Sequence, residues 1–444
     1  VYCAVYGTRR RAPLSRAVTV DRTVDYHHHR ITPSTMLASA PISSAARQSY
    51  AGARALEAGR RPARANGAFR ARTMITASIR STDGQKQAFR KPIESRNSIR
   101  MGIPSKGRMA EDTQALLSAC QLPVKKLNPR QYAAEIPSVP GMEIWFQRAT
   151  DVVRKILSGD IDVGIVGYDM LAEIGYGDDD LVIVHDALGF GGCHLAVAIP
   201  QAWDEINSMR ELMALPKWGP ARPLRVVTAY PNVAEKFFND IGFEHVEIST
   251  ADGALEAAPA MGAADCILDL VSSGTTLREN NLKEIEGGRV LDSQGVLVAS
   301  REALLKREGL LEIVHELLER LEAHLRAQGL FMVTANVRGS SPEEVAKKLN
   351  SAGPLMRGLQ GPTIAPVYTP QADGSSITGS FYAVSVTVPK SRIYETVKQM
   401  RTIGGSGVLT FPLTYVFDEE PPRWNALMTT LGLNAKDYEH LFRQ

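Results

Sequence analysis

Hydroxyl side chains gather around one glycine in residues 269–277, directly after an apolar run that ends at Val271. Gly274 has no Cβ, so a ligand can approach the backbone closely there. The flanking hydroxyls belong to Ser272, Ser273, Thr275 and Thr276. Hydroxyls beside backbone N–H groups favour a phosphate, and Asp269 could accept hydrogen bonds from sugar hydroxyls. The same pattern also fits an ordinary turn between two elements, so both interpretations stay open.

Two basic side chains follow a strand predicted at residues 99–104. Lys106 and Arg108 lie in the turn Ser-Lys-Gly-Arg, where the strand ends and a helix is expected to begin. The chain after residue 82 carries 37 basic and 45 acidic side chains, so an anion site there needs local cations. Lys106 and Arg108 are therefore candidates for neutralising phosphates, and the alternative is a solvated turn.

The composition indicates a globular chain of two or three domains. It has 444 residues, of which 44% are hydrophobic and 22% are charged, as is usual for globular proteins. No apolar run of about 18 residues occurs, so no membrane-spanning helix is expected. The four cysteines are scattered without a CxxC pair, which argues against a disulfide framework or a zinc site and fits a reducing compartment.

The N-terminal part has a composition of its own. Residues 1–82 hold 14 arginines, no lysine and three acids, and they are rich in Ala and Ser. An Arg-rich, Ser-rich and acid-poor segment is typical of an organelle transit peptide. We therefore expect residues 1–97 to be a disordered targeting arm, with Met36 as a possible start. The alternative is a basic arm that binds nucleic acid, but no aromatic residues alternate with its arginines.

Strands alternate with helices through the next 200 residues, which predicts an α/β architecture with mainly parallel sheets. Residues 98–200 are expected to form one lobe and residues 201–286 a second lobe that contains the hydroxyl loop. A long strand at 288–300 should return to the first lobe, followed by a helical region at 301–328, so that residues 287–328 connect the parts. Ligands of open α/β sheets bind at the carboxyl ends of strands, which predicts a cleft between the lobes.

The pattern changes after residue 328. Strand, helix, strand, strand, helix and strand follow one another through residues 329–420, and this βαββαβ order predicts a ferredoxin-like module. Such modules often bind regulators, although the fold alone proves no function. A glycine-rich turn that includes Gly405 and Ser406 is the candidate effector site, because glycine lets an amino acid approach the backbone. Residues 421–444 are expected to be a tail.

Five blocks of sequence occur in the order of a known family. They are Ile103–Arg108, Phe146–Asp151, Asp162–Asp169, Ala251–Pro259 and the run from Asp265 to Gly288. Together they resemble ATP phosphoribosyltransferase in its long, plant-like form with a C-terminal regulatory module, over about residues 98–435. The resemblance implies a two-lobed catalytic region, similar to periplasmic binding proteins, and a ferredoxin-like regulatory domain.

The resemblance also implies an activity. The family transfers the phosphoribosyl group of phosphoribosyl pyrophosphate to N1 of ATP, releases pyrophosphate, requires Mg²⁺ and performs the first step of histidine biosynthesis. It further implies inhibition by histidine, assembly into homodimers and hexamers, and, with the basic arm, a place in the plastid stroma; the alternative location is the cytoplasm. No nucleic acid or membrane partner is expected.

Positions in the matching blocks take expected roles on this basis. Asp269 would face the ribose and Ser272–Thr276 would hold the 5′-phosphate. The expected ATP and phosphate contacts are Lys106, Arg108, Arg148, Asp169 and Glu256. No side chain is expected to act as a strong general base, because the attacking adenine nitrogen needs little deprotonation.

Two other functions compete with this interpretation. A two-lobed binding or sensor protein without catalysis would have the same layout, but it does not need a ribose-phosphate loop followed by a ferredoxin-like module. A phosphoribosyltransferase acting on orotate or a purine base typically has paired acids directly before its loop, whereas Leu270 and Val271 stand there in this chain.

Overall fold

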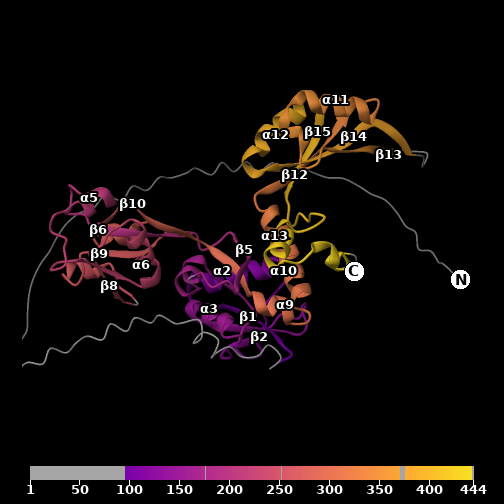
Figure 1. Cartoon of the computed structure of the whole chain (residues 1–444). Helices are drawn as coiled ribbons and strands as arrows, with labels where there is room; N and C mark the ends of the chain where they lie inside the picture. Colours follow the sequence, from indigo (N-terminus) through magenta and orange to yellow (C-terminus); the bar gives the residue numbers. More distant parts are fainter. Residues whose placement is uncertain (1–95, 176, 252, 371–375, 443–444) are drawn as a thin grey trace, which may run out of the picture. The chain divides into compact units, whose positions relative to one another are not determined.

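The computed structural model describes residues 96–442 apart from 176, 252 and 371–375. The expected targeting arm at 1–97, with the candidate start at Met36, therefore lies almost entirely outside the described residues. The described part is a mixed α/β protein with three sheets, which confirms the expected fold class (Figure 1). No helix in this part of the chain has the length and apolar character needed to cross a membrane.

The first sheet has six strands, with parallel strands at its centre. In spatial order it contains β2 (Ala133–Glu135), β3 (Met142–Gln147), β1 (Ile99–Pro104), β4 (Val163–Gly167), β11 (Gly295–Ser300) and β5 (Leu181–His185). β1 is parallel to β3 and β4, whereas β11 is antiparallel to β4 and β5. After these parallel strands come α2 (Gly107–Ala119), α3 (Ala149–Leu157), α4 (Tyr168–Met170) and η2 (Leu171–Gly175). The carboxyl ends of β1, β3 and β4 thus meet at one edge, the usual place for a ligand.

The second sheet has five strands and carries the hydroxyl loop. Its order is β10 (Leu282–Ser293), β6 (Cys193–Pro200), β9 (Cys266–Val271), β7 (Leu224–Thr228) and β8 (Val246–Thr250). β7 is parallel to β8 and β9, and β6 is antiparallel to β9 and β10. The helices of this part are α5 (Met209–Met213), α6 (Pro231–Asp240), α7 (Ala257–Ala260) and α8 (Thr275–Glu279).

Two connections join these sheets, and each differs from the expectation. Cys193–Pro200, expected in the first lobe with the rest of residues 98–200, form β6, which is hydrogen-bonded in the second sheet. The long strand expected at 288–300 is divided into β10 and β11 at Gln294, whose carbonyl accepts a hydrogen bond from the Tyr168 N–H at 2.9 Å. Apolar alternation marks a strand but not the sheet that it joins, because pairing depends on distant residues.

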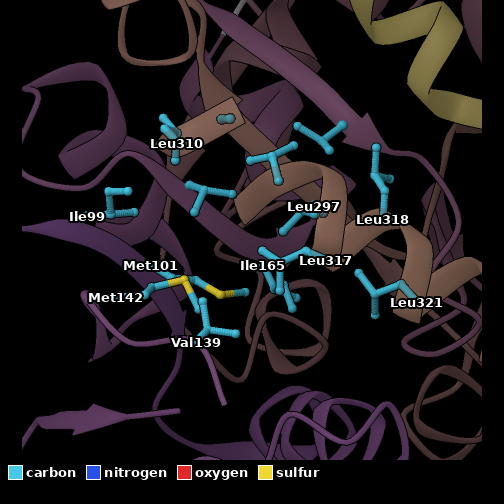
Figure 2. Close-up of a cluster of buried hydrophobic side chains, with 14 of the residues drawn as sticks. Ile99, Met101, Val139, Met142, Ile165, Leu297, Leu310, Leu317, Leu318 and Leu321 are labelled. Carbon is cyan, nitrogen blue, oxygen red and sulfur yellow. The ribbon is translucent and has the colours of Figure 1, made fainter. Parts of the chain in front are cut away.

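Helix α10 (Leu310–Ala327) forms much of the core beside the first sheet. Figure 2 draws Leu310, Leu317 and Leu321 of this helix together with Met101 and Leu297 of the sheet, and all belong to one buried cluster. The expected helical region at 301–328 is two helices, because α9 (Arg301–Lys306) ends before Gly309, whose φ of +75° favours glycine.

A C-terminal helix that the sequence analysis did not predict completes this core. α13 (Pro422–Leu431) carries Trp424, Leu427, Met428 and Leu431, all buried in the same cluster as α10. Trp424 is fully buried, and truncating such a side chain costs about 3–5 kcal/mol. The segment expected as a tail is therefore part of the first core; α13 is followed by η5 (Ala435–Phe442).

The third sheet belongs to the predicted βαββαβ module. The module consists of β12 (Leu330–Arg338), α11 (Pro342–Ala352), η3 (Pro354–Arg357), β13 (Thr363–Pro370), β14 (Ser376–Pro389), η4 (Lys390–Arg392), α12 (Ile393–Thr402) and β15 (Gly405–Pro412). The strand order β13-β14-β12-β15, antiparallel throughout, is that of a ferredoxin-like domain. Both α11 and α12 cover the same face of this sheet (Figure 1).

Candidate functional site

The hydroxyl loop connects the end of β9 to the start of α8. Gly274 has a φ of +67°, a conformation that side chains with a Cβ rarely adopt. The Ser273 and Thr275 hydroxyls are hydrogen-bonded at 3.0 Å, and both side chains are exposed, as are those of Ser272 and Thr276. The loop thus has the expected glycine-dependent turn and presents hydroxyl groups to solvent.

Arg278, which the sequence analysis did not single out, binds this loop from within α8. Its guanidinium donates to the Ser273 carbonyl oxygen at 3.2 Å and to Thr275 Oγ1 at 3.1 Å. A Cβ on Gly274 would lie 3.2 Å from the same guanidinium. The loop therefore includes a positive charge beside its hydroxyls. The sequence pattern that could have predicted this contact is a basic residue four positions after Gly274, about one helical turn away.

Asp269 lies two residues before the end of β9, and its side chain is partly buried. Its Oδ1 accepts a hydrogen bond from the Leu270 N–H at 2.7 Å. Burial raises the pKa of this carboxyl to about 6, the Glu256 carboxylate acts in the same direction, and the Leu270 N–H opposes them. Two of the expected site residues, Asp269 and Glu256, are thus close enough to influence each other electrostatically.

A cavity of about 370 Å³, here called the substrate cavity, lies between residues of the first and second sheets. Its walls are formed by Arg108, Met109, Asp112, Ala149, Gly167, Asp169, Met170, Gly191, Gly192, Cys193, Leu270 and Ser272. Three expected site residues from separate sequence blocks, Arg108, Asp169 and Ser272, therefore face one space. The other expected residues of the catalytic region do not line it: Lys106, Arg148, Glu256, Asp269, Ser273, Gly274, Thr275 and Thr276.

Lys106 and Arg148 nevertheless lie at the same sheet edge as Arg108. The neighbouring strands β1 and β3 end side by side, with Pro104 opposite Gln147, and the Ser105 N–H donates to the Gln147 carbonyl at 2.8 Å. Lys106 follows the first of these strands and Arg148 follows the second, and both are exposed. Three cationic side chains therefore lie at this edge of the first sheet, beside the cavity.

Asp169 is buried and has hydrogen-bond partners from the second sheet. Ser293 Oγ, at the end of β10, donates to Oδ1 at 2.6 Å and accepts from the Asp169 N–H at 2.9 Å. The Tyr230 hydroxyl, from the loop after β7, donates to Oδ2 at 3.0 Å. Burial first and Asp169 second raise the pKa of Tyr230, so its hydroxyl stays protonated as a donor. The sequence analysis proposed Asp169 but not these partners.

Glu173, like Asp169, is hydrogen-bonded to the segment that follows β7. This buried carboxylate accepts hydrogen bonds from the backbone N–H groups of Asn232 at 3.1 Å and Val233 at 3.0 Å, in the first turn of α6. The Asn232 side chain returns a hydrogen bond to the Glu173 carbonyl oxygen at 3.0 Å. Burial raises the pKa of Glu173, against the effect of these donors. A carboxylate is favoured here by the helix N-terminus.

Two glycines and a cysteine give the cavity its remaining wall. Gly191 has a φ of +70°, which favours glycine, and a Cβ there would lie 2.5 Å from Met109 Sδ, so the Met109 side chain would have to shift. Burial and the Asp169 carboxylate raise the pKa of the Cys193 thiol, which is therefore a neutral group and not a thiolate nucleophile.

The candidate effector turn shows structural reasons for its residues. A Cβ on Gly405 would lie 2.5 Å from the Met400 carbonyl oxygen, so close packing against α12 requires glycine there. The exposed Ser406 donates its hydroxyl to the Asn336 carbonyl oxygen at 3.3 Å. An effector role for Gly405 and Ser406 stays a prediction.

Comparisons with known proteins agree on one family. The family model for ATP phosphoribosyltransferase matches residues 148–323, and the model for the HisG C-terminal domain matches residues 327–415. The chain is 56% identical to ATP phosphoribosyltransferase 2, chloroplastic, of Arabidopsis thaliana, over 81% of this chain and 88% of that protein. It is 57% identical to ATP phosphoribosyltransferase 1, chloroplastic, of the same plant, over 77% and 83%.

A solved structure also resembles part of the chain. The ATP phosphoribosyl transferase (HisG:HisZ) complex from Thermotoga maritima covers 50% of this chain and 98% of that chain, with 23% identity and a TM-score of 0.40.

Proposed function

The chain belongs to the ATP phosphoribosyltransferase family, and we propose that its two substrates react in the substrate cavity. The enzyme joins ATP to phosphoribosyl pyrophosphate in histidine biosynthesis. The observation that carries the proposed location is the meeting of Arg108, Asp169 and Ser272 in one cavity, since these residues come from three separate blocks of sequence.

The reaction replaces pyrophosphate at the anomeric carbon of ribose by a nitrogen of the adenine ring, N1 in our proposal. Positive charge develops on the ribose and negative charge on the leaving pyrophosphate. The protein therefore contributes mainly by positioning the substrates and stabilising charge. The neutral Cys193 thiol and the protonated Tyr230 hydroxyl fit this scheme, because neither is available as a nucleophile.

The hydroxyl loop is the proposed site of the ribose 5′-phosphate. Ser272–Thr276 supply hydroxyl and N–H donors, and Arg278 adds positive charge within hydrogen-bond distance of Ser273 and Thr275. Asp269, at the end of the same strand, would accept hydrogen bonds from the ribose hydroxyls. Its pKa of about 6 leaves the carboxyl mainly ionised at neutral pH, as an acceptor must be.

The sheet edge with Lys106, Arg108 and Arg148 is the proposed site of the other phosphates. Arg108 lines the cavity directly, and guanidinium groups bind phosphate oxygens with two parallel hydrogen bonds. Asp169 holds Tyr230 and Ser293 in place beside it. Glu256 is the proposed contact for the ribose or base of ATP, because it shares the electrostatic environment of Asp269.

The family's chemistry uses a divalent metal ion, for which we propose Mg²⁺. The described residues contain no group of three or more His, Cys, Asp or Glu side chains that could hold a metal by themselves. They do place the exposed carboxylate of Asp112 in the cavity wall. One carboxylate with substrate oxygens fits Mg²⁺, which commonly keeps few protein ligands. The ion would neutralise pyrophosphate charge, and Asp112 is the residue that would hold it.

The regulatory and assembly properties are also proposals. Histidine inhibition would act through the ferredoxin-like module, at the turn with Gly405 and Ser406. Exposed apolar side chains on its edge strand β15, Leu409 and Phe411, favour contact with another copy of the chain and hence a homo-oligomer, a dimer or hexamer.

The location of the protein is the plastid. Both Arabidopsis relatives are named chloroplastic and match most of this chain. We propose that the Arg-rich segment in residues 1–82 directs import, because its composition is that of a transit peptide.

An Arg108→Ala variant tests the proposed site. The chain is mixed with ATP, phosphoribosyl pyrophosphate and Mg²⁺, and the N1 adduct is followed by ultraviolet absorbance. Loss of a charge-assisted phosphate contact should lower kcat/KM about 10- to 100-fold. The control is Arg154→Ala, an exposed arginine on α3 whose ion pair with Asp151 is long, at 3.8 Å. Equal activity of the two variants would remove the support for this cavity while leaving the family assignment intact.

A further inference from the structure

Helix α6 begins without a cap of its own. Its N-cap residue is Tyr230, whose side chain makes no capping hydrogen bond, and Pro231, the first helical residue, has no N–H group. The next two N–H groups belong to Asn232 and Val233. A Ser, Thr, Asp or Asn side chain at the N-cap usually satisfies N–H groups at these positions. Helix α6 therefore needs acceptors from another part of the chain.

Glu173 supplies both acceptors. Its Oε1 accepts from the Asn232 N–H at 3.1 Å and its Oε2 from the Val233 N–H at 3.0 Å. Glu173 is 3% exposed and lies in η2, 59 residues before Asn232 in the chain. The two carboxylate oxygens thus replace the missing cap by a tertiary contact, and the helix N-terminus favours their negative charge.

A carboxylate is an expensive side chain for this buried position. Burial of a charged group is unfavourable unless hydrogen bonds compensate for it, and burial is the cause of the raised pKa of Glu173. An apolar side chain of the same size would also fill the space, and apolar replacements of buried ion pairs are often neutral or stabilising. The carboxylate adds direction, because two charge-assisted hydrogen bonds from adjacent N–H groups fix the first turn of α6 relative to η2.

The cap from Glu173 leaves the N-cap position free for a tyrosine. The Tyr230 hydroxyl donates to Asp169 Oδ2 at 3.0 Å, and Asp169 lines the substrate cavity. The shorter side chain of an ordinary N-cap residue would turn toward the helix N–H groups and could not serve Asp169 in the same way. The Tyr230 N–H also donates to Thr228 Oγ1 at 2.9 Å, so the backbone of this residue is held on the side of β7 as well.

Asp169 and Glu173 hold this segment from consecutive helical stretches, α4 and η2. They are four residues apart, which is about one helical turn, so their side chains can face the same neighbour. Asp169 binds the Tyr230 hydroxyl, and Glu173 binds the N–H groups that follow it in the chain. A shift of the first turn of α6 away from Glu173 would therefore displace Tyr230 from Asp169.

We propose that Glu173 is a positioning residue for the reaction. By capping α6 from a distant segment, it holds Tyr230 where the hydroxyl binds Asp169. Glu173 is not in the wall of the substrate cavity, so it acts through these two residues. Without the cap, the Asp169 carboxylate loses a fixed partner and can turn within the cavity wall. This inference rests on the proposed location of the reaction in the substrate cavity.

Two neutral replacements of similar size test the cap. Glu173→Gln keeps one acceptor oxygen, whereas Glu173→Met keeps none and fills the same space. We expect kcat/KM to fall about fivefold in Glu173→Gln and about thirtyfold in Glu173→Met, since the first loses one hydrogen bond and the second loses both. A role limited to packing predicts that the apolar Met serves at least as well as Gln. Equal or higher kcat/KM in Glu173→Met would therefore overturn the proposal.

A double-mutant cycle tests whether Glu173 acts through Tyr230. Tyr230→Phe alone should lower kcat/KM about thirtyfold, and adding Glu173→Gln should lower it less than about twofold further, because the positioned hydroxyl is already absent. Independent losses in the double variant would overturn the positioning role and leave the substrate cavity as proposed. Full activity of Tyr230→Phe would overturn the positioning role and also remove support for the reaction's location in this cavity.

Glu322→Gln is the matched control. Glu322 is also buried, and its Oε1 accepts from the backbone N–H of Arg423 at 3.3 Å, in the first turn of α13. It is not in the substrate cavity wall. This variant should lower Tm and keep kcat/KM within about twofold of the wild type. A loss of kcat/KM as large as that of Glu173→Gln would show that any broken contact to a helix N-terminus has the same effect, which would overturn the proposal.

An exposed position provides the same test if Glu173→Met does not fold, as judged by far-ultraviolet circular dichroism. The Asn232 side chain is exposed and donates to the Glu173 carbonyl oxygen at 3.0 Å. Asn232→Ala should lower kcat/KM about threefold, and this loss should disappear in the Tyr230→Phe background. Asn239→Ala, at another exposed position of α6, is its control and should keep full activity. Equal activity of Asn232→Ala and Asn239→Ala would overturn the proposal.

Discussion

The substrate cavity and a second cavity, lined by residues of α10 and by residues 416–423, differ in how their buried polar groups are paired. In the substrate cavity the buried carboxylate of Asp169 has a partner for each oxygen, Ser293 and Tyr230, whereas the exposed Arg108 and Ser272 face the open space. In the cavity beside α10, His185 Nε2 and Glu322 Oε2 are buried and have no hydrogen-bond partner among the described residues. A site that must bind charged substrates in water can fix its buried groups internally and offer exposed ones.

Removing Asp169 would leave the substrate cavity with unpaired buried groups, like those of the cavity beside α10. Asp169→Ala leaves the buried Tyr230 and Ser293 hydroxyls without their shared acceptor, so we expect kcat/KM to fall at least about a hundredfold, equivalent to about 3 kcal/mol. Steady-state kinetics with both substrates measures the effect.

A double variant checks the reason for that loss. If Tyr230 acts through Asp169, then Tyr230→Phe should add little to Asp169→Ala, because both remove the same hydrogen bond. Additive losses would mean that the two side chains act separately. Asp151→Ala, in the first turn of α3, serves as the control and should keep full activity.

Replacing Gly274 tests whether the hydroxyl loop depends on its backbone conformation. Gly274→Val forces a β-branched residue to a φ of +67° beside the Arg278 guanidinium, a strain of about 2 kcal/mol. The KM for phosphoribosyl pyrophosphate should rise about thirtyfold while the KM for ATP changes less.

Gly262→Val is a matched control for this substitution. Gly262 has a φ of +70°, and a Cβ there would meet no atom within 4 Å. It should lower thermal stability by a similar amount without raising the KM for phosphoribosyl pyrophosphate. The same rise in both variants would show that general destabilisation, and not the loop, is responsible.

The smallest expected effect concerns Asp269 and pH. Because its pKa is raised to about 6, the carboxylate is lost as the pH falls through 6. The ratio of kcat/KM between the wild type and Asp269→Asn should be about five at pH 7.5, which corresponds to the free energy of about one hydrogen bond. The ratio should approach one at pH 5, where the carboxyl is mostly protonated. A ratio is needed because phosphate esters also titrate near pH 6 in both enzymes.

The stability of the protein provides an independent check on the same group. A carboxyl with a raised pKa binds more protons in the folded state than in the unfolded state between about pH 4 and 6. The wild type should therefore lose stability relative to Asp269→Asn as the pH rises through this window. A difference of the opposite sign in denaturant melts would contradict the burial of Asp269.

Some of the site could be predicted from the sequence because its signals are local. The turn at Gly274, the cluster of hydroxyls and the strand before them are neighbours in the chain, and so are the strands and helices of the βαββαβ module. The approach of Tyr230 and Ser293 to Asp169 could not be predicted from the sequence. It depends on how β10 and the loop after β7, both of the second sheet's part of the chain, lie against α4, which follows a strand of the first sheet.

Helix α13 was missed for another reason. Trp424, Leu427, Met428 and Leu431 have the spacing of one helical face, so the signal was present. The expectation of a tail after the regulatory module outweighed it. Only the packing of this helix into the first core reveals that the end of the described chain supports the catalytic part and contributes to the wall of the cavity beside α10.

The most direct test is a crystal structure of the chain with phosphoribosyl pyrophosphate bound. We predict the ribose 5′-phosphate against the Ser272–Thr276 loop, with the anomeric carbon facing the cavity wall that holds Arg108 and Asp169. If the substrate bound elsewhere, or if the loop stayed closed by its own hydrogen bonds to Arg278 with the phosphate absent, the proposed site would be wrong.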